Sequence, residues 1–371
     1  MKTLITRYPR TIGYTVIAAL QLTAFFAAML NNRLDPAHIS NVLLSVIVVC
    51  CGFEIDMLKL EKKDTPPVKI NTLMRRATPA PAPGSDEWKR KITASKVASI
   101  VCKSPLTSKF ALHAEMTGRY EADPINPAVL EAGNILEPAV ADWFQLHNPG
   151  VEVRECKKRN TPVWWVSRDS EDFAATPDRI LVDKATGEVT ALLEIKTARV
   201  ASEWGEEGTD EIPEHYRLQA LWQMKCTGVR TVIFAVLHSG LRFATYRVEW
   251  NRYTVAELTA AATDFMDAVR TGRTPDYKEE PGAFSTYEVL RCYFPECNGE
   301  AVMLSDDLVY RTRRAKRLKR LAARAEDIVK TELTAVMGNA SAGVDYANRT
   351  VARRSQRKTP KGFSRPWVTM V

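Results

Sequence analysis

The chain has 371 residues, of which 45% are hydrophobic and 26% charged, the composition of an ordinary globular protein with room for two domains. Its 52 Lys and Arg against 44 Asp and Glu give a formal net charge of +8, which favours a polyanionic partner. The seven cysteines are odd in number and widely spread, which excludes a disulfide framework and indicates reduced thiols in the cytoplasm.

The N-terminal stretch is the most apolar part of the chain. An uncharged run, TIGYTVIAALQLTAFFAAML, is long enough to cross a bilayer, and a shorter uncharged run follows at residues 39–53. Basic residues flank both runs, so the positive-inside rule favours a transmembrane hairpin over residues 11–53 with both ends in the cytoplasm. The alternatives are a buried helical pair, or a reading frame that truly starts at Met57 or Met74.

Composition divides the chain into four parts. Residues 1–64 form the hydrophobic segment, and residues 65–86 read as a Pro/Ala-rich linker with little that could build a core. We expect a folded domain over residues 87–272 and a basic extension over residues 273–371, with a helix at 308–337.

The folded domain begins with a basic approach to a helix, WKRKITASKVASIV. Thr93 or Ser95 is expected near the N-cap. Hydroxyls and backbone N–H groups at a helix start, beside Lys89, Arg90 and Lys91, fit a phosphate site. A simple cap among solvated lysines is the alternative.

A second helix is predicted over residues 130–147. It carries an apolar stripe: Leu136, Val140 and Phe144. Pro138 cannot donate within a helix, so either the chain kinks there or a new helix starts at Glu137. Glu137 could then ligate a metal, or only complement the helix dipole.

Residues 173–199 predict a β-hairpin whose turn carries Gly187. If the turn closes symmetrically, Asp183 faces Val189 and Asp178 faces Glu194. Two carboxylates opposed on neighbouring strands repel each other, and structure alone gives no reason to place them there.

Lys196 lies two residues beyond Glu194 and therefore projects from the same face of the sheet. A hard divalent cation such as Mg²⁺ would remove the repulsion between the carboxylates. The hairpin thus favours a metal-dependent phosphodiester hydrolase site, with a solvated face carrying a Lys–Glu pair as the alternative.

Further elements follow the hairpin. Pro213 opens a helix that Gly228 ends, and one face of it carries three polar side chains: Tyr216, Gln219 and Gln223. Two β-rich runs around Ser239–Gly240 predict a second hairpin. Thr254 and Glu257 form a capping box that opens the next helix.

The C-terminal part is strongly basic. Eight cations fall in one helical stretch: Arg311, Arg313, Arg314, Lys316, Arg317, Lys319, Arg320 and Arg324. Such a density of positive charge favours DNA binding, because it would release counterions from the DNA backbone. A solvated or partner-binding helix is the alternative. Cys292 and Cys297 are close together but lack a second pair for a zinc or iron–sulfur site.

Four motifs occur in a fixed order: ITAS at 92–95, GNILEP at 133–138, TPD through LEIK at 176–196, and IPEHYRLQALWQMKCTG from Ile212. Together they resemble the YqaJ-type viral recombinases, relatives of phage lambda exonuclease within the PD-(D/E)XK nucleases. The resemblance covers about residues 88–270. It implies an α/β fold of the restriction-endonuclease type, with a mixed central sheet flanked by helices.

The resemblance also implies a two-metal Mg²⁺ or Mn²⁺ site. Asp178, Glu194, Glu137 and the carbonyl of Ile195 would be the metal ligands. Lys196 would orient and activate the attacking water.

Other site residues follow from the same resemblance. Tyr216 and Gln219 match the family's Y-x-x-Q motif beside the site. Ser95 and Thr176 fall where the family holds a terminal 5′-phosphate, with Arg90 as the candidate partner. Arg179 stands where the family usually has glycine, and could contact the phosphate or tighten the turn.

Members of the family typically digest duplex DNA from 5′ ends, and a single-strand annealing protein uses the 3′ strand left behind. Toroidal trimers are known among the lambda-like relatives, so a homo-oligomer is compatible with the resemblance. We weigh three rivals: a structure-specific or restriction-like endonuclease, a membrane-tethered DNA-binding protein with an inactive nuclease fold, and a nuclease with an iron–sulfur cluster.

Overall fold

The computed structural model describes residues 68–123, 126–280, 283–359 and 362–371. The chain divides into two compact units between Pro295 and Glu296. The transmembrane hairpin predicted over residues 11–53 lies outside the described residues. Within the described ranges, no helix is both long and apolar enough to span a bilayer.

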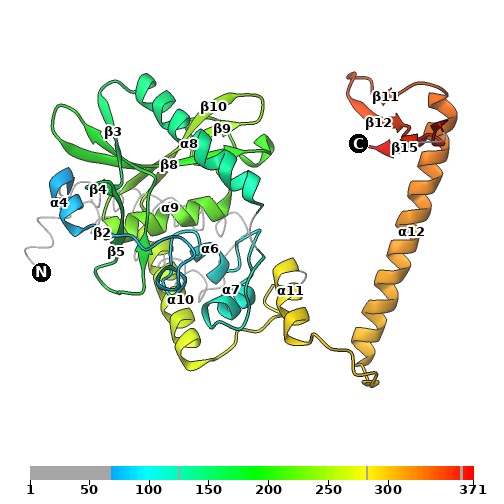
Figure 1. Cartoon of the computed structure of the whole chain (residues 1–371), viewed down its shortest axis with the longest axis horizontal. Coiled ribbons are helices and arrows are strands. Elements are labelled where there is room, and N and C mark those ends of the chain that lie inside the picture. The colour runs from blue at the N-terminus through cyan, green and yellow to red at the C-terminus, as the bar shows by residue number, and fades with distance from the viewer. Residues whose placement is uncertain (1–67, 124–125, 281–282, 360–361) are drawn as a thin grey trace, which may run out of the picture. The chain divides into compact units, whose positions relative to one another are not determined.

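A six-stranded mixed sheet forms the centre of the first unit (Figure 1). Its strand order is β10-β9-β8-β7-β3, with β1 pairing with β8, and only β8 and β9 run parallel. The strands are β1 (Val68–Lys69), β3 (Val151–Glu155), β7 (Arg179–Asp183), β8 (Glu188–Ala198), β9 (Thr231–His238) and β10 (Arg242–Glu249).

A smaller sheet and several short helices complete the first unit. The smaller sheet joins β2 (Thr78–Pro79), β4 (Lys157–Lys158), β5 (Thr161–Val166) and β6 (Ala174–Ala175). The short helices are α4 (Ile70–Arg76), α5 (Asp86–Lys89), α6 (Val97–Ile100), α7 (Lys109–Met116), η1 (Ala201–Glu203) and α11 (Phe284–Tyr293). The longer helices are α8 (Pro127–His147), α9 (Glu214–Thr227) and α10 (Arg252–Thr271).

Helices cover both faces of the central sheet (Figure 1). On one face α8 packs through Val140 and Phe144 against Leu193 and other buried residues. On the other face α9 packs against Leu192 and its neighbours, with α6 and α10 beyond it. Side chains alternate between the faces of a strand, so β8 is apolar on both sides where helices cover it. The predicted fold class, a mixed central sheet flanked by helices, is confirmed.

The hairpin formed by β7 and β8 has the predicted register near the candidate site. Arg179 pairs with Leu193, and this register places Asp178 opposite Glu194, as expected. Toward the turn the register shifts at a bulge, and Val182 rather than Asp183 pairs with Val189. A bulge adds one residue to one strand, so the register predicted from a symmetric turn is wrong beyond the bulge.

The predicted linker over residues 65–86 is wrong for its central part. In it, β1 pairs with β8, and α4 buries Ile70 and Leu73 in the main core. Burying a Leu side chain such as Leu73 contributes about 1.5–3 kcal/mol, so this segment belongs to the folded unit. The prolines around this segment favoured a linker, although VKINTLM at residues 68–74 contains four apolar residues.

Three helix starts differ from the expectation. Neither Thr93 nor Ser95 caps α6, whose N-cap is Lys96. Helix α8 runs unbroken through Pro138 from Pro127, with Asn126 as its cap. The predicted stripe residue Leu136 stays 37% exposed, because only the second half of α8 contacts the sheet.

Helix α10 begins earlier than the predicted capping box. The Asn251 side chain accepts hydrogen bonds from the N–H groups of Tyr253 and Thr254, so it replaces Thr254 as the N-cap. Gly228 and Gly272 end α9 and α10 in the left-handed conformation, which glycine adopts without a Cβ penalty. The hairpin of β9 and β10 forms as predicted.

The second unit contains the predicted basic helix, α12 (Asp306–Met337), with Ser305 as its N-cap. A three-stranded sheet that was not predicted packs on the end of this helix through Met337, Ala352 and Val368. The short strands of this unit are β11 (Ala342–Val344), β12 (Thr350–Ser355), β13 (Lys358–Thr359), β14 (Gly362–Phe363) and β15 (Trp367–Met370). The boundary expected at residue 272 falls inside the first unit, where α11 packs against α7.

Candidate active site

Glu194 is the centre of the candidate site. It is only 3% exposed and lies on the face of β8 that α9 covers. Its Oε1 accepts hydrogen bonds from Lys196 Nζ at 2.7 Å and from Gln219 Nε2, and its Oε2 accepts one from Gln223 Nε2 at 2.7 Å. A buried carboxylate is stable only when such donors replace water, so these three side chains hold Glu194 in place.

Helix α9 supplies two of these donors because Gln219 and Gln223 are four residues apart and share one face. Gln223 is fully buried, and its Oε1 has no hydrogen-bond partner among the described residues. It was placed on the polar face with Tyr216 and Gln219 in the sequence, but not among the site residues. The spacing from Gln219 was the signal that could have identified it.

Asp178 directly precedes β7 and lies beside β8. Its Oδ2 accepts a hydrogen bond of 2.7 Å from the backbone N–H of Ile195. Burial and the negative charge of Glu194 raise the pKa of Asp178 well above its ordinary value, and the positive charge of Lys196 only partly offsets them. The predicted repulsion between the two carboxylates is therefore present in the folded chain.

Lys196 lies 4.9 Å from the ring centroid of Tyr216 and is ion-paired with Glu194 at 2.7 Å. Burial lowers the pKa of Lys196, but attraction to Glu194 and Asp178 outweighs burial and the net pKa is raised. Lys196 therefore remains a cation at neutral pH. Its chemistry here is to supply positive charge and N–H donors rather than to accept a proton.

His215 is a second residue near the site that the sequence did not single out. Its ring lies against that of Tyr216, with the centroids 4.0 Å apart. Burial and the positive charge of Lys196 lower the pKa of His215, so the ring is neutral at pH 7. The Tyr216 ring thus contacts both His215 and Lys196.

Glu137 and Arg179 form an ion pair of 2.6 Å, and Arg179 also donates to the backbone carbonyl of Asp178 at 2.8 Å. Arg179 reaches Glu137 because its side chain lies on the face of the sheet that α8 covers, opposite to that of Glu194. This pairing differs from both expected roles, with Glu137 as a metal ligand and Arg179 on a phosphate.

The donor set of Asp178 and Glu194 fits a divalent cation. Both are hard oxygen donors, and their mutual repulsion is what a cation relieves. Asp178 Oδ1 has no hydrogen-bond partner among the described side chains and backbone. The carbonyl of Ile195 lies on the same edge of β8 as its N–H, which faces Asp178.

Two further expectations about metals can be compared with the structure. The described residues contain no group of three or more His, Cys, Asp or Glu side chains placed to hold a metal ion. Asp178, Glu194, Glu137 and the Ile195 carbonyl stay a prediction as metal ligands, and Glu137 is ion-paired with Arg179 in the structure. Cys292 and Cys297 are exposed free thiols.

The residues proposed for a terminal phosphate are only partly brought together. A parallel β-bridge joins Ile92 to Phe173. Ser95 lies three residues after Ile92, and Thr176 lies three residues after Phe173. Both side chains are exposed. Thr93 and Ser95 share a hydroxyl contact of 3.2 Å. Arg90 is exposed at the end of α5, and no contact among the described residues links it to either hydroxyl.

Lys96 organises this loop, although the sequence did not distinguish it from its basic neighbours. Its ammonium group donates to three backbone carbonyls, those of Trp88 at 3.2 Å, Lys89 at 2.9 Å and Lys91 at 2.8 Å. It also lies 4.3 Å from the ring centroid of Trp88. Burial lowers the pKa of Lys96 to about 8.

The fold and the site together define the class of protein. Pro177-Asp178 directly precedes β7, and the triplet Glu194-Ile195-Lys196 lies on the neighbouring strand β8 of a mixed sheet, which is the arrangement of a PD-(D/E)XK nuclease core. Residues 85–230 match the family model of the YqaJ-like viral recombinase domain. The predicted resemblance is confirmed.

Several solved structures are similar to about half of the chain. An alkaline exonuclease (LHK-Exo) from Laribacter hongkongensis is 21% identical, with a TM-score of 0.38 over 51% of this chain and 94% of that chain. Its complex with dAMP is 22% identical, with a TM-score of 0.39 over the same shares of the two chains, 51% and 94%. A phage-related exonuclease from Haemophilus somnus 129PT is 13% identical, with a TM-score of 0.34 over 49% and 96%. No curated protein matches the chain.

Proposed function

We propose that the chain is a metal-dependent DNA exonuclease of phage type, which hydrolyses duplex DNA from 5′ ends and leaves 3′ single strands for annealing. The observation that carries the proposal is the buried Glu194, held by Lys196, Gln219 and Gln223 beside Asp178. The match of residues 85–230 to the YqaJ-like viral recombinase domain supports DNA as the substrate.

In the proposed chemistry a bound metal ion and the side chains of the site have different roles. Bound Mg²⁺ or Mn²⁺ would neutralise the scissile phosphate and activate water for in-line attack. Asp178, Glu194 and the Ile195 carbonyl would hold the ion. Glu137 would join a second site only if its ion pair with Arg179 opened.

The remaining side chains would position the reacting groups. Lys196 is cationic at neutral pH, so it would orient the attacking water and stabilise the negative charge that develops on the phosphate. Gln219 and Gln223 fix the orientation of Glu194, and so the geometry at which it meets an ion.

A time course on DNA tests the function. With Mg²⁺, we expect purified protein to release nucleotides from linear duplex DNA with 5′-phosphates, and to leave covalently closed circular DNA intact. With EDTA, neither substrate should change. A matched duplex with 5′-hydroxyl ends should be digested more slowly if a terminal phosphate is bound.

The rival functions give different outcomes in the same experiment. Cleavage of closed circles would identify an endonuclease instead. DNA binding without any cleavage, with Mg²⁺ or Mn²⁺, would identify an inactive nuclease fold. Product strands that are shortened from their 3′ ends would contradict the proposed polarity.

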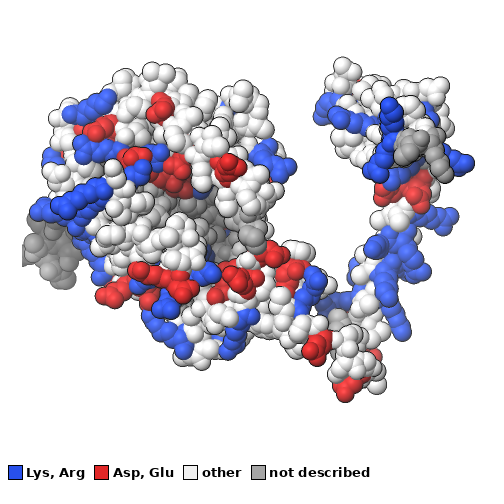
Figure 2. Space-filling model, in the orientation of Figure 1, with Lys and Arg blue, Asp and Glu red and all other residues white. Residues whose placement is uncertain are grey.

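Helix α12 is proposed as an additional contact with the DNA backbone. Its eight clustered cations, from Arg311 to Arg324, are all exposed, and basic side chains cover much of the helix in Figure 2. The proposed partners are duplex DNA, single-strand annealing proteins and further copies of the chain. Helix α12 is proposed to contact the duplex DNA. The positive charge of α12 complements the phosphate backbone.

Removing positive charges from α12 should lower the affinity for DNA and reduce the salt dependence of that affinity. With Arg313, Arg317, Arg320 and Arg324 changed to Gln, we expect the slope of log K against log salt to decrease by about 0.9 for each phosphate that is no longer neutralised. Lys330→Gln on the same helix, where Lys330 is ion-paired with Glu326, is the matched control and should leave the slope unchanged. An unchanged slope in the fourfold variant would exclude α12 from the DNA interface.

A further inference from the structure

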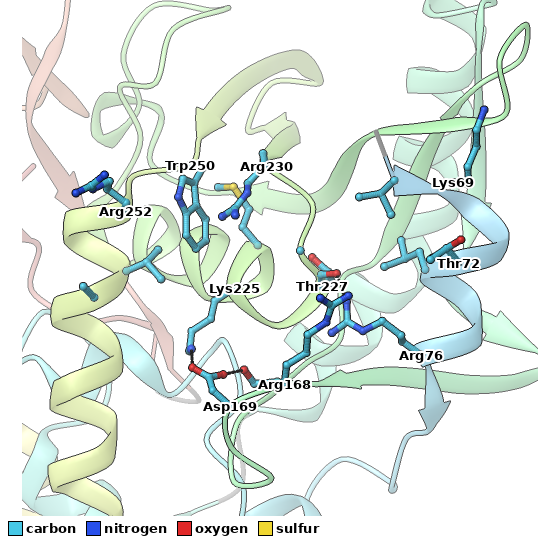
Figure 3. Close-up of a pocket in the computed structure, with 17 residues that line it drawn as sticks. Lys69, Thr72, Arg76, Arg168, Asp169, Lys225, Thr227, Arg230, Trp250 and Arg252 are labelled. Atoms are coloured by element: carbon cyan, nitrogen blue, oxygen red, sulfur yellow. Dashed lines mark hydrogen bonds and ion pairs between the residues drawn. The ribbon is translucent and has the colours of Figure 1, made fainter. Parts of the chain in front are cut away.

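A cavity of about 640 Å³ opens in the first unit where α9 ends at Gly228 (Figure 3). Helix α4, the loop after β5, the end of α9 and the start of α10 contribute its walls. Six basic residues line it against a single acidic one, Asp169. The basic residues are Lys69, Arg76, Arg168, Lys225, Arg230 and Arg252.

This cavity is separate from the candidate active site. Gln219, which binds Glu194, and Gly228 at the cavity are about 13 Å apart along α9, at a rise of 1.5 Å per residue. The cavity also lies at the end of β8 where β1 pairs with Val189, whereas Glu194 lies farther along that strand.

Arg76 and Arg168 bring two positive charges together at the cavity wall (Figure 3). Arg76 donates to the last carbonyls of α9, those of Thr227 at 2.6 Å and Cys226 at 2.9 Å. Burial and the charge of Arg168 lower the pKa of Arg76, so the two guanidinium groups repel each other. Arg168 has no hydrogen bond or ion pair among the described residues, and an anion there would offset the repulsion.

The single acidic residue does not neutralise Arg168. The carboxylate of Asp169 is bound by Lys225 at 2.6 Å through one oxygen and by the hydroxyl of Ser167 through the other (Figure 3). Lys225 is 8% exposed, and its charge is paired with Asp169 in that contact. The positive charge of Arg168 is therefore left for a ligand, whereas the Arg252 guanidinium points away from the cavity and lies 4.9 Å from the ring centroid of Tyr253 (Figure 3).

The cavity also offers an aromatic ring and neutral donors. The indole Nε1 of Trp250 is buried without a hydrogen-bond partner among the described residues, and the Arg230 guanidinium lies 3.8 Å from the Trp250 ring centroid. Thr72 lines the opposite wall (Figure 3). Planar guanidinium groups match phosphate oxygens in pairs, and an unpaired indole N–H can donate to a phosphate or a base.

We propose that this cavity binds the phosphate group of a nucleotide, either free or within a DNA strand. An acidic peptide would satisfy the arginines, but it offers less to the Trp250 indole than a nucleotide with a base and several acceptors does. The inference concerns binding alone and does not depend on the proposed nuclease reaction.

Calorimetric titration of the full chain in EDTA tests the proposal, because binding that a metal bridges is then absent. The probes are dAMP, single-stranded dT8, inorganic phosphate and an octaglutamate peptide. We expect binding of dAMP or dT8 that weakens about tenfold in Arg168→Gln, since the change removes a charged hydrogen bond. The Arg168 side chain is exposed, so its loss leaves the fold intact.

Arg291→Gln is the matched control. Arg291 is an exposed arginine of α11, ion-paired with Glu288, and its loss should not change the affinity. Similar affinities for dAMP and dT8 would assign the site to free nucleotides, whereas much tighter binding of dT8 would assign it to a DNA strand. Both outcomes support the proposal.

Three results would overturn the proposal: equal affinities in the wild type and Arg168→Gln, tighter binding of octaglutamate than of either nucleotide probe, or binding of inorganic phosphate alone. Failure of the nuclease function is recognised separately. In that case the protein would still bind the probes in an Arg168-dependent way but would digest no DNA with Mg²⁺.

Discussion

Glu194→Gln should reduce the release of nucleotides from linear duplex DNA by about 10²–10³-fold or more, the range seen when one electrostatic group of an active site is lost. The change removes the negative charge that would bind the cation. It also places an amide N–H₂ against donors, because Gln219 and Gln223 both donate to the carboxylate oxygens. The measurement is acid-soluble nucleotide formed per minute with Mg²⁺.

Glu188→Gln is the matched control on the same strand. Glu188 is partly exposed and ion-paired with Lys69 at 3.1 Å, at the opposite end of β8. Surface ion pairs of this kind contribute about 0–1 kcal/mol, so this variant should digest DNA at the wild-type rate. Circular dichroism would verify that both variants fold. A fully active Glu194→Gln enzyme would show that the chemistry lies elsewhere in the chain.

Asp178→Asn should change activity and stability in opposite directions. Activity should fall by about 10²-fold or more, because a proposed charged ligand of the cation is lost. The metal-free protein should become more stable at neutral pH, because the substitution removes the repulsion by Glu194 and keeps an oxygen for the Ile195 N–H. About 1 kcal/mol would raise the midpoint of thermal unfolding by roughly 2–4 °C.

The stabilisation by Asp178→Asn should depend on pH with a defined sign. The pKa of Asp178 is raised in the folded chain, so the protonated form stabilises the fold at low pH and this contribution is lost as pH rises through the folded pKa. The variant should therefore exceed the wild type in stability only above that pKa. Thermal melts in EDTA across this pH range measure the difference. Equal melting temperatures at neutral pH would contradict it.

Magnesium should reduce this difference. In the proposed site the wild-type protein would bind the cation between Asp178 and Glu194, and binding to the folded state alone would raise its stability. Asp178→Asn lacks one charged ligand and should gain less from the same Mg²⁺ concentration. A gain equal to that of the wild type would remove Asp178 from the proposed ligand set.

Much of the site was predictable because it depends on local rules. The hairpin register near Asp178 and Glu194 follows from strand pairing, and the projection of Lys196 from the same face follows from the period of two. The face of α9 that carries Gln219 and Gln223 follows from helical spacing. The ordered motifs identified the family without any tertiary contact.

Other features depended on contacts between distant segments. Whether Gln223 was solvent-exposed or buried depended on the packing of α9 over β8. Arg179 binds Glu137 because α8 crosses the opposite face of the sheet, which no spacing within either segment reveals. Lys96 differs from its lysine neighbours only because the loop folds three carbonyls onto it.

The sequence by itself determined the class of protein, the two strands that carry Asp178, Glu194 and Lys196, and the basic character of α12. Periodicity and short-range pairing encode these features within a few residues. Only the tertiary structure decided that residues 68–79 join the core, that Glu137 is neutralised by Arg179, and that six basic residues surround one cavity. Burial and charge pairing between segments far apart in the chain are properties of the whole packing, so no local pattern carries them.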